Sequence, residues 1–155
     1  MQTYLLNLFF GFSGRIGRKR WWLGTLAIAI GSIAGTLLID PGVLDFQRTD
    51  PRIPNWSDTI WQLALVIPAT ALMVKRFNDR NRPYWLGYAF GVVGAMLTAG
   101  PHFGLFHTER PSTVETAVTI IFALAFLFAF IDNGFLRGSS GPNRYGPDPL
   151  NETAS

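Results

Sequence analysis

The sequence predicts an all-α integral membrane protein: a bundle of four transmembrane helices with an interfacial helix at the amino terminus. Four long apolar runs alternate with short charged segments, and 48% of the 155 residues are hydrophobic while only 15% are charged. A soluble domain carries about 25% charged residues. The basic residues gather in every second hydrophilic segment, which is the pattern of a chain that crosses a bilayer several times.

The charge of the chain narrows the choice of partners. The formal net charge is +3 and the isoelectric point is near 9.7, which by themselves suit nucleic acid. The basic side chains lie beside apolar runs, however, so we expect the lipid bilayer and its anionic phospholipid headgroups as partners, and no nucleic acid. Each basic residue near such a surface contributes about 1 kcal/mol. The chain has no cysteine, which excludes disulfides, thiolate metal sites and cysteine nucleophiles.

The amino-terminal segment, residues 4–12, is apolar at almost every position except Asn7. It is too short to cross a hydrocarbon core about 30 Å thick. Because basic residues follow it directly, we expect a helix that lies along the membrane surface. The segment lacks the basic start of a signal peptide, so the apolar run that follows is expected to be retained as a span.

The first two spans are predicted at residues 21–39 and 59–74. The first is an uncharged stretch of 19 residues, close to the roughly 20 that a transmembrane helix needs. Trp21 and Trp22 stand at its start, where an interfacial aromatic belt belongs. Residues 40–57, which are rich in proline and acids, are expected to connect the two spans on the far side of the membrane.

The second pair of spans is predicted at residues 84–100 and 116–136, after a charge-dense loop at residues 75–82. The last span is rich in phenylalanine, and the segment after it is rich in Gly, Pro, Ser and Asn, which indicates a loop. We expect one membrane domain over residues 1–150 and a disordered tail at residues 151–155.

The distribution of basic residues predicts the orientation. Ten of the 13 Lys and Arg residues fall in the first, third and last hydrophilic segments. Basic loops stay on the cytoplasmic side, so both termini are expected there. The ten are Arg15, Arg18, Lys19, Arg20, Lys75, Arg76, Arg80, Arg82, Arg137 and Arg144.

Three short motifs share this predicted cytoplasmic face. They contain Phe12, Gly14, Arg15, Arg18, Trp21 and Trp22, then Lys75, Arg76 and Asp79, then Asn143, Arg144, Tyr145, Gly146, Asp148 and Pro149. Together these residues resemble the bacterial domain-of-unknown-function family 805. The resemblance covers nearly the whole chain and implies a small multi-pass protein of the bacterial inner (plasma) membrane, in a family with no established activity. In the second motif, Asn78 stands where that family usually has a histidine.

Seven charged residues in or near these motifs form the predicted site: Arg15, Arg18, Arg76, Asp79, Asp132, Arg144 and Asp148. Three interpretations remain open. The charges form a structural collar of ion pairs that fixes helix ends; or the arginines bind phosphate-bearing headgroups or another anion; or Asp79 and Asp132 act as acid and base. Asp132 is notable because it is an acid within an apolar run.

These patterns favour a non-enzymatic membrane module, either structural or binding a partner or lipid. A small oligomeric transporter or channel is the alternative, and an enzyme that modifies lipid headgroups is a third. Two kinds of assembly stay open: a homo-oligomer, or a complex with a second membrane protein. No metal or cofactor is expected, because the sequence has no zinc-helix motif, phosphate loop or nucleophile elbow. His102 and His107 fit a solvated loop better than a metal site.

Overall fold

The computed structural model describes residues 2–44, 55–105 and 111–150, and within these ranges the regular structure is helical. Apart from the helices, the described residues contain one isolated bridge between Asn143 and Gly146. The disorder predicted for residues 151–155 lies outside the described residues. The helices are α1 Gln2–Phe10, α2 Arg18–Ile39, α3 Trp56–Asp79, α4 Trp85–Ala99 and α5 Thr113–Gly134, with short 3-10 turns η1 Pro41–Leu44 and η2 Gly100–Phe103.

Two of the helix starts are fixed by side-chain caps. The Asn55 side chain accepts a hydrogen bond of 2.9 Å from the backbone N–H of Ser57 at the start of α3. Ser112 and Glu115 form a capping box at the start of α5, in which each side chain accepts from the other residue's backbone N–H. Such caps satisfy N–H groups that have no partner within the helix. They explain why both helices begin three residues before the predicted spans.

Three helices, α2, α3 and α5, are long and apolar enough to cross a membrane. The helix predicted at residues 84–100 is present as α4, but it has only 15 residues. At 1.5 Å per residue it is roughly 22 Å long, which is shorter than a hydrocarbon core of about 30 Å. The turn η2 continues directly from its last residue.

The end of α3 corrects the sequence prediction. A loop was expected at residues 75–82, but α3 continues to Asp79. Its last turn is buried, with Lys75 only 2% and Arg76 0% exposed. The prediction was wrong because it ended the helix at the first charged residue. Charged residues can stay inside a folded helix end when other parts of the chain supply partners for them.

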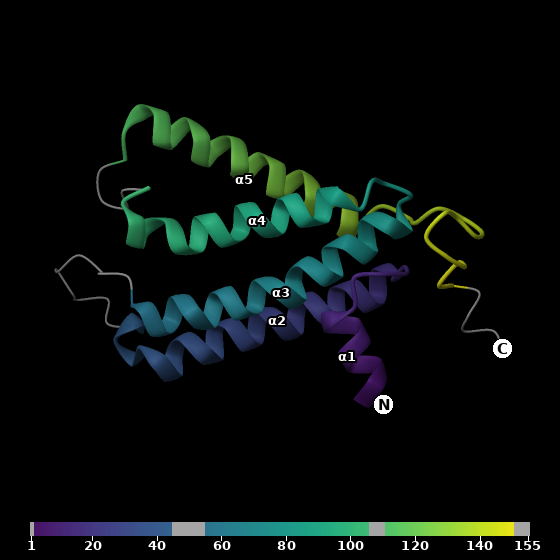
Figure 1. Cartoon of the computed structure of the whole chain (residues 1–155), viewed down its shortest axis with the longest axis horizontal. Helices are drawn as coiled ribbons and strands as arrows, with labels where there is room; N and C mark the ends of the chain where they lie inside the picture. The colour runs from purple at the N-terminus through teal and green to yellow at the C-terminus, as the bar shows by residue number, and fades with distance from the viewer. Residues whose placement is uncertain (1, 45–54, 106–110, 151–155) are drawn as a thin grey trace.

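The helix α3 is the centre of the bundle. It packs against α2, α4 and α1, and Figure 1 shows it running lengthwise between α2 and α4. Ile16, Trp21 and Leu72 form the buried apolar cluster where α2 meets α3. Gly87 lets α4 approach closely, because a Cβ there would lie 2.7 Å from the Cα of Val74.

Much of the apolar surface of the long helices points outward. On α2, Ile33 is 62% and Leu38 83% exposed, and on α5 Ile121 is 63% exposed. Large exposed apolar faces are rare on soluble monomers and suit contact with lipid or with another protein. The fold is therefore that of a helical membrane protein, in agreement with the predicted class.

One end of the bundle, which we call the charged end, gathers segments that are far apart in the sequence. It contains the start of α2, the ends of α3 and α5, and the tail that follows α5 (Figure 1). Trp22 Nε1 donates a hydrogen bond of 3.0 Å to the carbonyl of Gly134, which ties α2 to the last residue of α5. The helix α1 projects from the bundle at the same end (Figure 1).

Candidate functional site

The carboxylate of Asp79, at the last residue of α3, is held by two buried arginines. Both Nε and Nη2 of Arg15 lie 3.1 Å from Oδ1 of Asp79. Arg76, one helical turn before Asp79, pairs with the other oxygen, Oδ2. The side chains of Arg15 and Arg76 are 1% and 0% exposed. Hydrogen bonds to two guanidinium groups compensate for the removal of all three charges from water.

The same two arginines also anchor the tail after α5. Arg15 donates to the carbonyls of Ser139 at 2.7 Å, Gly141 at 2.8 Å and Gly146 at 3.2 Å. Arg76 donates to the carbonyls of Asn133 and Leu136, both at 2.6 Å. These carbonyls follow the end of α5 or belong to its last turn, where helical partners run out. The arginines therefore link three distant segments through one carboxylate.

The second carboxylate, that of Asp132, is 1% exposed and lies in the last turn of α5. Arg82 Nη2 donates to its Oδ1 at 2.8 Å, and Arg80 donates to Oδ1 at 3.3 Å and to Oδ2 at 3.4 Å. Arg80 and Arg82 belong to the short loop between α3 and α4. Asp132 thus joins α5 to this loop, and its partners are 20% and 40% exposed, so they still reach water.

The tail after α5 is a folded segment that is hydrogen-bonded to the end of α3. Ser139 N–H donates to the carbonyl of Asp79 at 2.8 Å, and Asn143 Nδ2 donates to the carbonyl of Asn78 at 2.9 Å. The Tyr145 hydroxyl donates to the carbonyl of Arg82 at 2.8 Å. Residues 138–146 therefore dock on the last carbonyl groups of α3 and on the loop that follows it.

Asp148 closes the tail upon itself. Its carboxylate accepts backbone N–H groups from Leu150 and from Gly141, both at 3.0 Å. These two hydrogen bonds, first that of Leu150 and then that of Gly141, lower the pKa of Asp148 below its ordinary value, and the charges of Arg15 and Arg137 act in the same direction. Asp148 is therefore a carboxylate at neutral pH and serves as a turn-closing acceptor.

Two buried asparagines at this end are only partly satisfied by the described residues. Asn78 Nδ2 donates to the carbonyl of Gly14 at 3.0 Å, but its Oδ1 is buried with no hydrogen-bond partner among them. Asn133 is 0% exposed, and neither polar atom of its side chain has a partner in the described part of the chain. Buried polar atoms of this kind reduce the stability of the fold unless something else pairs with them.

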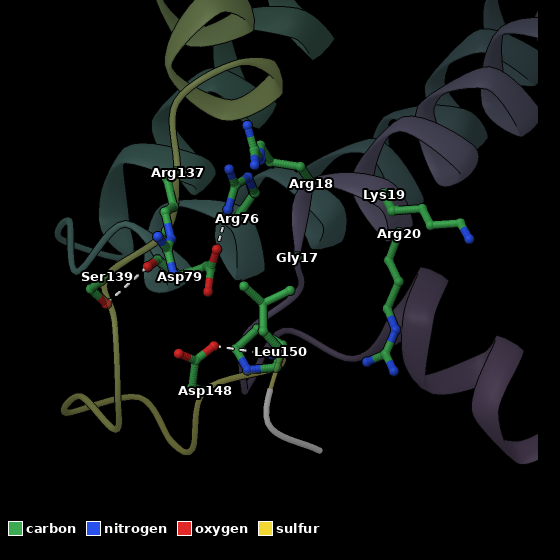
Figure 2. Close-up of a pocket in the computed structure, with 12 residues that line it drawn as sticks. Gly17, Arg18, Lys19, Arg20, Arg76, Asp79, Arg137, Ser139, Asp148 and Leu150 are labelled. Atoms are coloured by element: carbon green, nitrogen blue, oxygen red, sulfur yellow. Dashed lines mark hydrogen bonds and ion pairs between the residues drawn. The ribbon is translucent and has the colours of Figure 1, made fainter. Parts of the chain in front are cut away.

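A cavity of about 420 Å³ opens beside the Arg76–Asp79 pair. Figure 2 shows Arg18, Arg76 and Arg137 on one side of the Asp79 carboxylate, and Asp148 and Leu150 on the other. The segments that line this cavity are the start of α2, the end of α3 and the tail. Its lining residues are Gly17, Arg18, Lys19, Arg20, Arg76, Asp79, Arg137, Gly138, Ser139, Asp148, Pro149 and Leu150.

The structure brings together most of the seven predicted site residues. Arg15, Arg76, Asp79 and Asp148 meet around the cavity and the tail, and Asp132 lies at the neighbouring end of α5, as described above. Arg18 donates to the carbonyl of Phe135 at 3.1 Å and lines the cavity. Arg144 is separate from the carboxylates: it is exposed, stacks over the Tyr145 ring at 4.7 Å and reaches the carbonyl of Asn81 at 3.4 Å.

Sequence reasoning did not assign roles to four further basic residues. Arg80 and Arg82 are the partners of Asp132, and Arg137 lines the cavity. Lys75 Nζ donates to the carbonyls of Asn7 and Leu8 at 2.6 Å each, so it caps the end of α1. The available signal was the density of basic residues at 75–82 and 137–144, but nothing local specifies which acid or carbonyl each one meets.

Among the described residues, no group of three or more His, Cys, Asp or Glu side chains could hold a metal ion. His102 lies at the opposite end of the bundle, where it stacks on Trp56 with ring centroids 3.8 Å apart. His107 falls outside the described residues.

Comparison with known proteins places the chain in a family. No solved structure matches it. The chain is 31% identical over 153 residues to the inner membrane protein YhaI of Escherichia coli K12, covering 96% of both chains. It is 27% identical over 140 residues to the uncharacterized protein YiiR of the same strain, covering 90% of this chain and 86% of the relative. The family described as "Protein of unknown function (DUF805)" matches residues 9–147, and the chain belongs to that family.

Proposed function

We propose that this protein is a non-enzymatic module of the bacterial inner membrane that crosses the bilayer four times and binds anionic phospholipid headgroups at its cytoplasmic end. The observation that carries the proposal is how the carboxylates and arginines of the charged end are paired. Each of its two buried helix-end carboxylates, Asp79 and Asp132, is satisfied by two arginines, while further basic residues surround them.

The path of α4 supports a fourth crossing. At the end of the bundle opposite Asp79, Thr59 Oγ1 and His102 Nε2 share a hydrogen bond of 2.7 Å. The chain leaves α3 at Asp79, enters α4 at Trp85 and reaches His102 beside the start of α3. The segment formed by α4 and η2 therefore covers nearly the same axial distance as α3, so it would cross whatever thickness of membrane α3 crosses.

The orientation follows from the basic residues. The first, third and last hydrophilic segments, which hold ten of the 13 Lys and Arg residues, converge at the charged end. Positively charged segments are retained in the cytoplasm during insertion, which puts both termini there. The relative YhaI is named an inner membrane protein and covers nearly the whole chain, which supports the same membrane for this protein.

The pairing of the carboxylates argues against an enzyme that modifies headgroups. A general acid or base must present a carboxyl group to the substrate with a proton-accepting position free. Asp79 and Asp132 instead accept hydrogen bonds from guanidinium groups on both oxygens. Paired in this way, they hold helix ends and the tail together, which is a structural role.

A small oligomeric transporter or channel is the second candidate, because polar side chains enter the bundle between α2 and α3. A hydrogen-bonded chain runs from Asp58 through Thr36 and Gln62 to Ser32, with distances of 2.6, 2.8 and 2.9 Å. Its members bond to one another, and nearer the charged end α2 and α3 meet through Trp21 and Leu72. A path through the membrane would need polar groups there as well.

Lipid retention tests the proposal. The full chain is extracted in a mild neutral detergent, exposed to an equal mixture of phosphatidylglycerol and phosphatidylcholine, and analysed by native mass spectrometry. We expect phosphatidylglycerol to be retained preferentially, and the preference to decline with rising salt, because exposed charges are screened. Equal retention of the two lipids would contradict the proposal, and a water-filled conductance in planar bilayers would favour the transporter.

A further inference from the structure

The cavity beside Asp79 has an excess of positive charge. Five basic residues and two carboxylates line it, which leaves a formal excess of +3. The five are Arg18, Lys19, Arg20, Arg76 and Arg137, and the acids are Asp79 and Asp148. Like charges gathered around one concave space repel one another, and the field between them is strongest where water is excluded.

The two carboxylates do not neutralise this excess. Asp79 already pairs with Arg76 and with Arg15, and the Asp148 carboxylate accepts two backbone N–H groups. Within the described part of the chain, the ion pairs leave Arg18, Lys19, Arg20 and Arg137 without a carboxylate partner. In Figure 2, Lys19 and Arg20 extend away from the Asp79 carboxylate, whereas Arg18 and Arg137 approach the Arg76–Asp79 pair. The Arg20 guanidinium lies over the Tyr4 ring, 5.6 Å from its centroid.

We propose that this cavity binds a phosphate group, with Arg18 and Arg137 as its ligands. The inference rests on the proposed function and deepens it, because it assigns headgroup binding to one defined site. Arginine is suited to this role: its planar guanidinium donates two parallel N–H groups to the oxygens of a phosphate. Two arginines from two segments can contact a tetrahedral anion on different sides.

The start of α2 adds to the positive potential of the site. Gly17, which precedes α2, lines the cavity and provides no side-chain cap. The first N–H groups of a helix have no partner within the helix and carry part of its positive dipole. Because α2 has 22 residues, its dipole is fully developed, and an anion in the cavity would lie near its positive end.

The cavity is large enough for a phosphate ester. About 420 Å³ falls within the range of about 300 to 1,000 Å³ that small-molecule pockets occupy. Its ligand can be the headgroup of a membrane lipid or a soluble phosphate ester, and both present the same group. Trp21 and Trp22, one turn beyond Arg18, are of the type that marks the membrane interface, so a headgroup could reach the site from the bilayer.

Binding to the full chain in neutral detergent micelles tests the inference, with short-chain phosphatidic acid and glycerol 3-phosphate as separate probes in isothermal titration. The key variant is Arg137→Gln, because Arg137 forms no ion pair with the described residues. We expect its affinity for the binding probe to be about tenfold lower, which corresponds to the loss of one charge-assisted hydrogen bond.

The matched control is Arg144→Gln, which removes the same charge from the same end of the molecule but does not line the cavity. We expect this variant to bind like the wild type. If only phosphatidic acid binds, the ligand is a lipid headgroup; if glycerol 3-phosphate binds equally well, it is a soluble ester. Either result supports the phosphate site. Unchanged binding by Arg137→Gln, an equal loss with Arg144→Gln, or no binding of either probe would overturn it.

Failure of this inference is distinct from failure of the proposed function. If the protein retains phosphatidylglycerol preferentially while Arg137→Gln binds phosphatidic acid normally, headgroup binding occurs elsewhere on the charged end. A second outcome is that the probes bind, that Arg137→Gln weakens their binding, and that the charged end faces away from the cytoplasm. The cavity is then a phosphate site, and the proposed cytoplasmic role is wrong.

Discussion

Arg15 and Asp79, 64 positions apart in the sequence, meet as a buried pair in which Nε and Nη2 of the arginine both lie 3.1 Å from one carboxylate oxygen. The segment before α2 is thereby fixed to the end of α3. Because Arg15 also bonds to three carbonyls of the tail, the pair is the point at which the two ends of the described chain are joined.

Replacement of Asp79 should be the most destabilising single change at the charged end. In Asp79→Asn, two arginines with side chains 1% and 0% exposed would remain buried without a counter-charge. Breaking a buried pair in this way costs about 3–5 kcal/mol. Thermal unfolding of the purified protein in detergent should show a clearly lowered midpoint, whereas Arg144→Gln should leave it unchanged. Equal midpoints for Asp79→Asn and the wild type would refute a structural role for the pair.

Replacement of Asp132 should also destabilise the protein, but less. Arg80 and Arg82 are partly exposed and can turn toward water when Asp132→Asn removes their partner, so we expect a loss of about 1–3 kcal/mol. The amount of protein that accumulates in the membrane should fall in proportion to this loss of stability. An Asp132→Asn variant as abundant and as stable as the wild type would contradict a structural role for this carboxylate.

Gly138 should tolerate no side chain. A Cβ at this position would collide with the carboxylate of Asp79, and overpacking of this kind costs about 1–3 kcal/mol. Gly138→Ala should therefore detach the tail, which limited proteolysis would detect as faster cleavage after Arg144. Ser140→Ala is the control, because Ser140 is exposed two residues away. Equal cleavage rates for both variants would show that the tail is not docked as described.

The tail should loosen in acid through Asp148. Hydrogen bonds from Leu150 and Gly141 lower the pKa of this group in the folded protein, so the stability it contributes is fully present above the unfolded-state pKa of about 3.9. That contribution is lost as the pH falls through the lowered folded-state pKa. Hydrogen exchange of the Gly141 amide, corrected for its intrinsic rate, should accelerate in that range. In Asp148→Asn the amide should exchange faster at neutral pH and show no such transition.

The sequence was sufficient to predict the helical membrane class and the family, because both predictions depend on local features. Apolar runs predict helices wherever they occur, and the three motifs are contiguous stretches of residues. The start of α5 was missed by three residues, since Ser112 and Glu115 form a capping box that the hydropathy of the run does not reveal.

The details of the charged end could not be predicted, because they depend on long-range pairing. Nothing near Asp132 in the sequence indicates that Arg80 and Arg82 reach it, and nothing near Arg15 indicates a carboxylate in α3. The burial of Lys75 has the same cause: its partners are the last carbonyls of α1. Arg144 belongs to a recognisable motif, yet it is exposed and away from both carboxylates. The motif docks instead through the side chains of Asn143 and Tyr145 and the carbonyl of Gly146.

Cysteine accessibility in intact cells tests the four-crossing account most directly, since the chain has no cysteine of its own. Ser140→Cys reports on the charged end, and Phe103→Cys, at a residue 69% exposed in η2, reports on the other. A membrane-impermeant maleimide should label position 103 in intact spheroplasts and position 140 only after lysis. Labelling of position 140 in intact spheroplasts, or protection of both positions, would contradict the account.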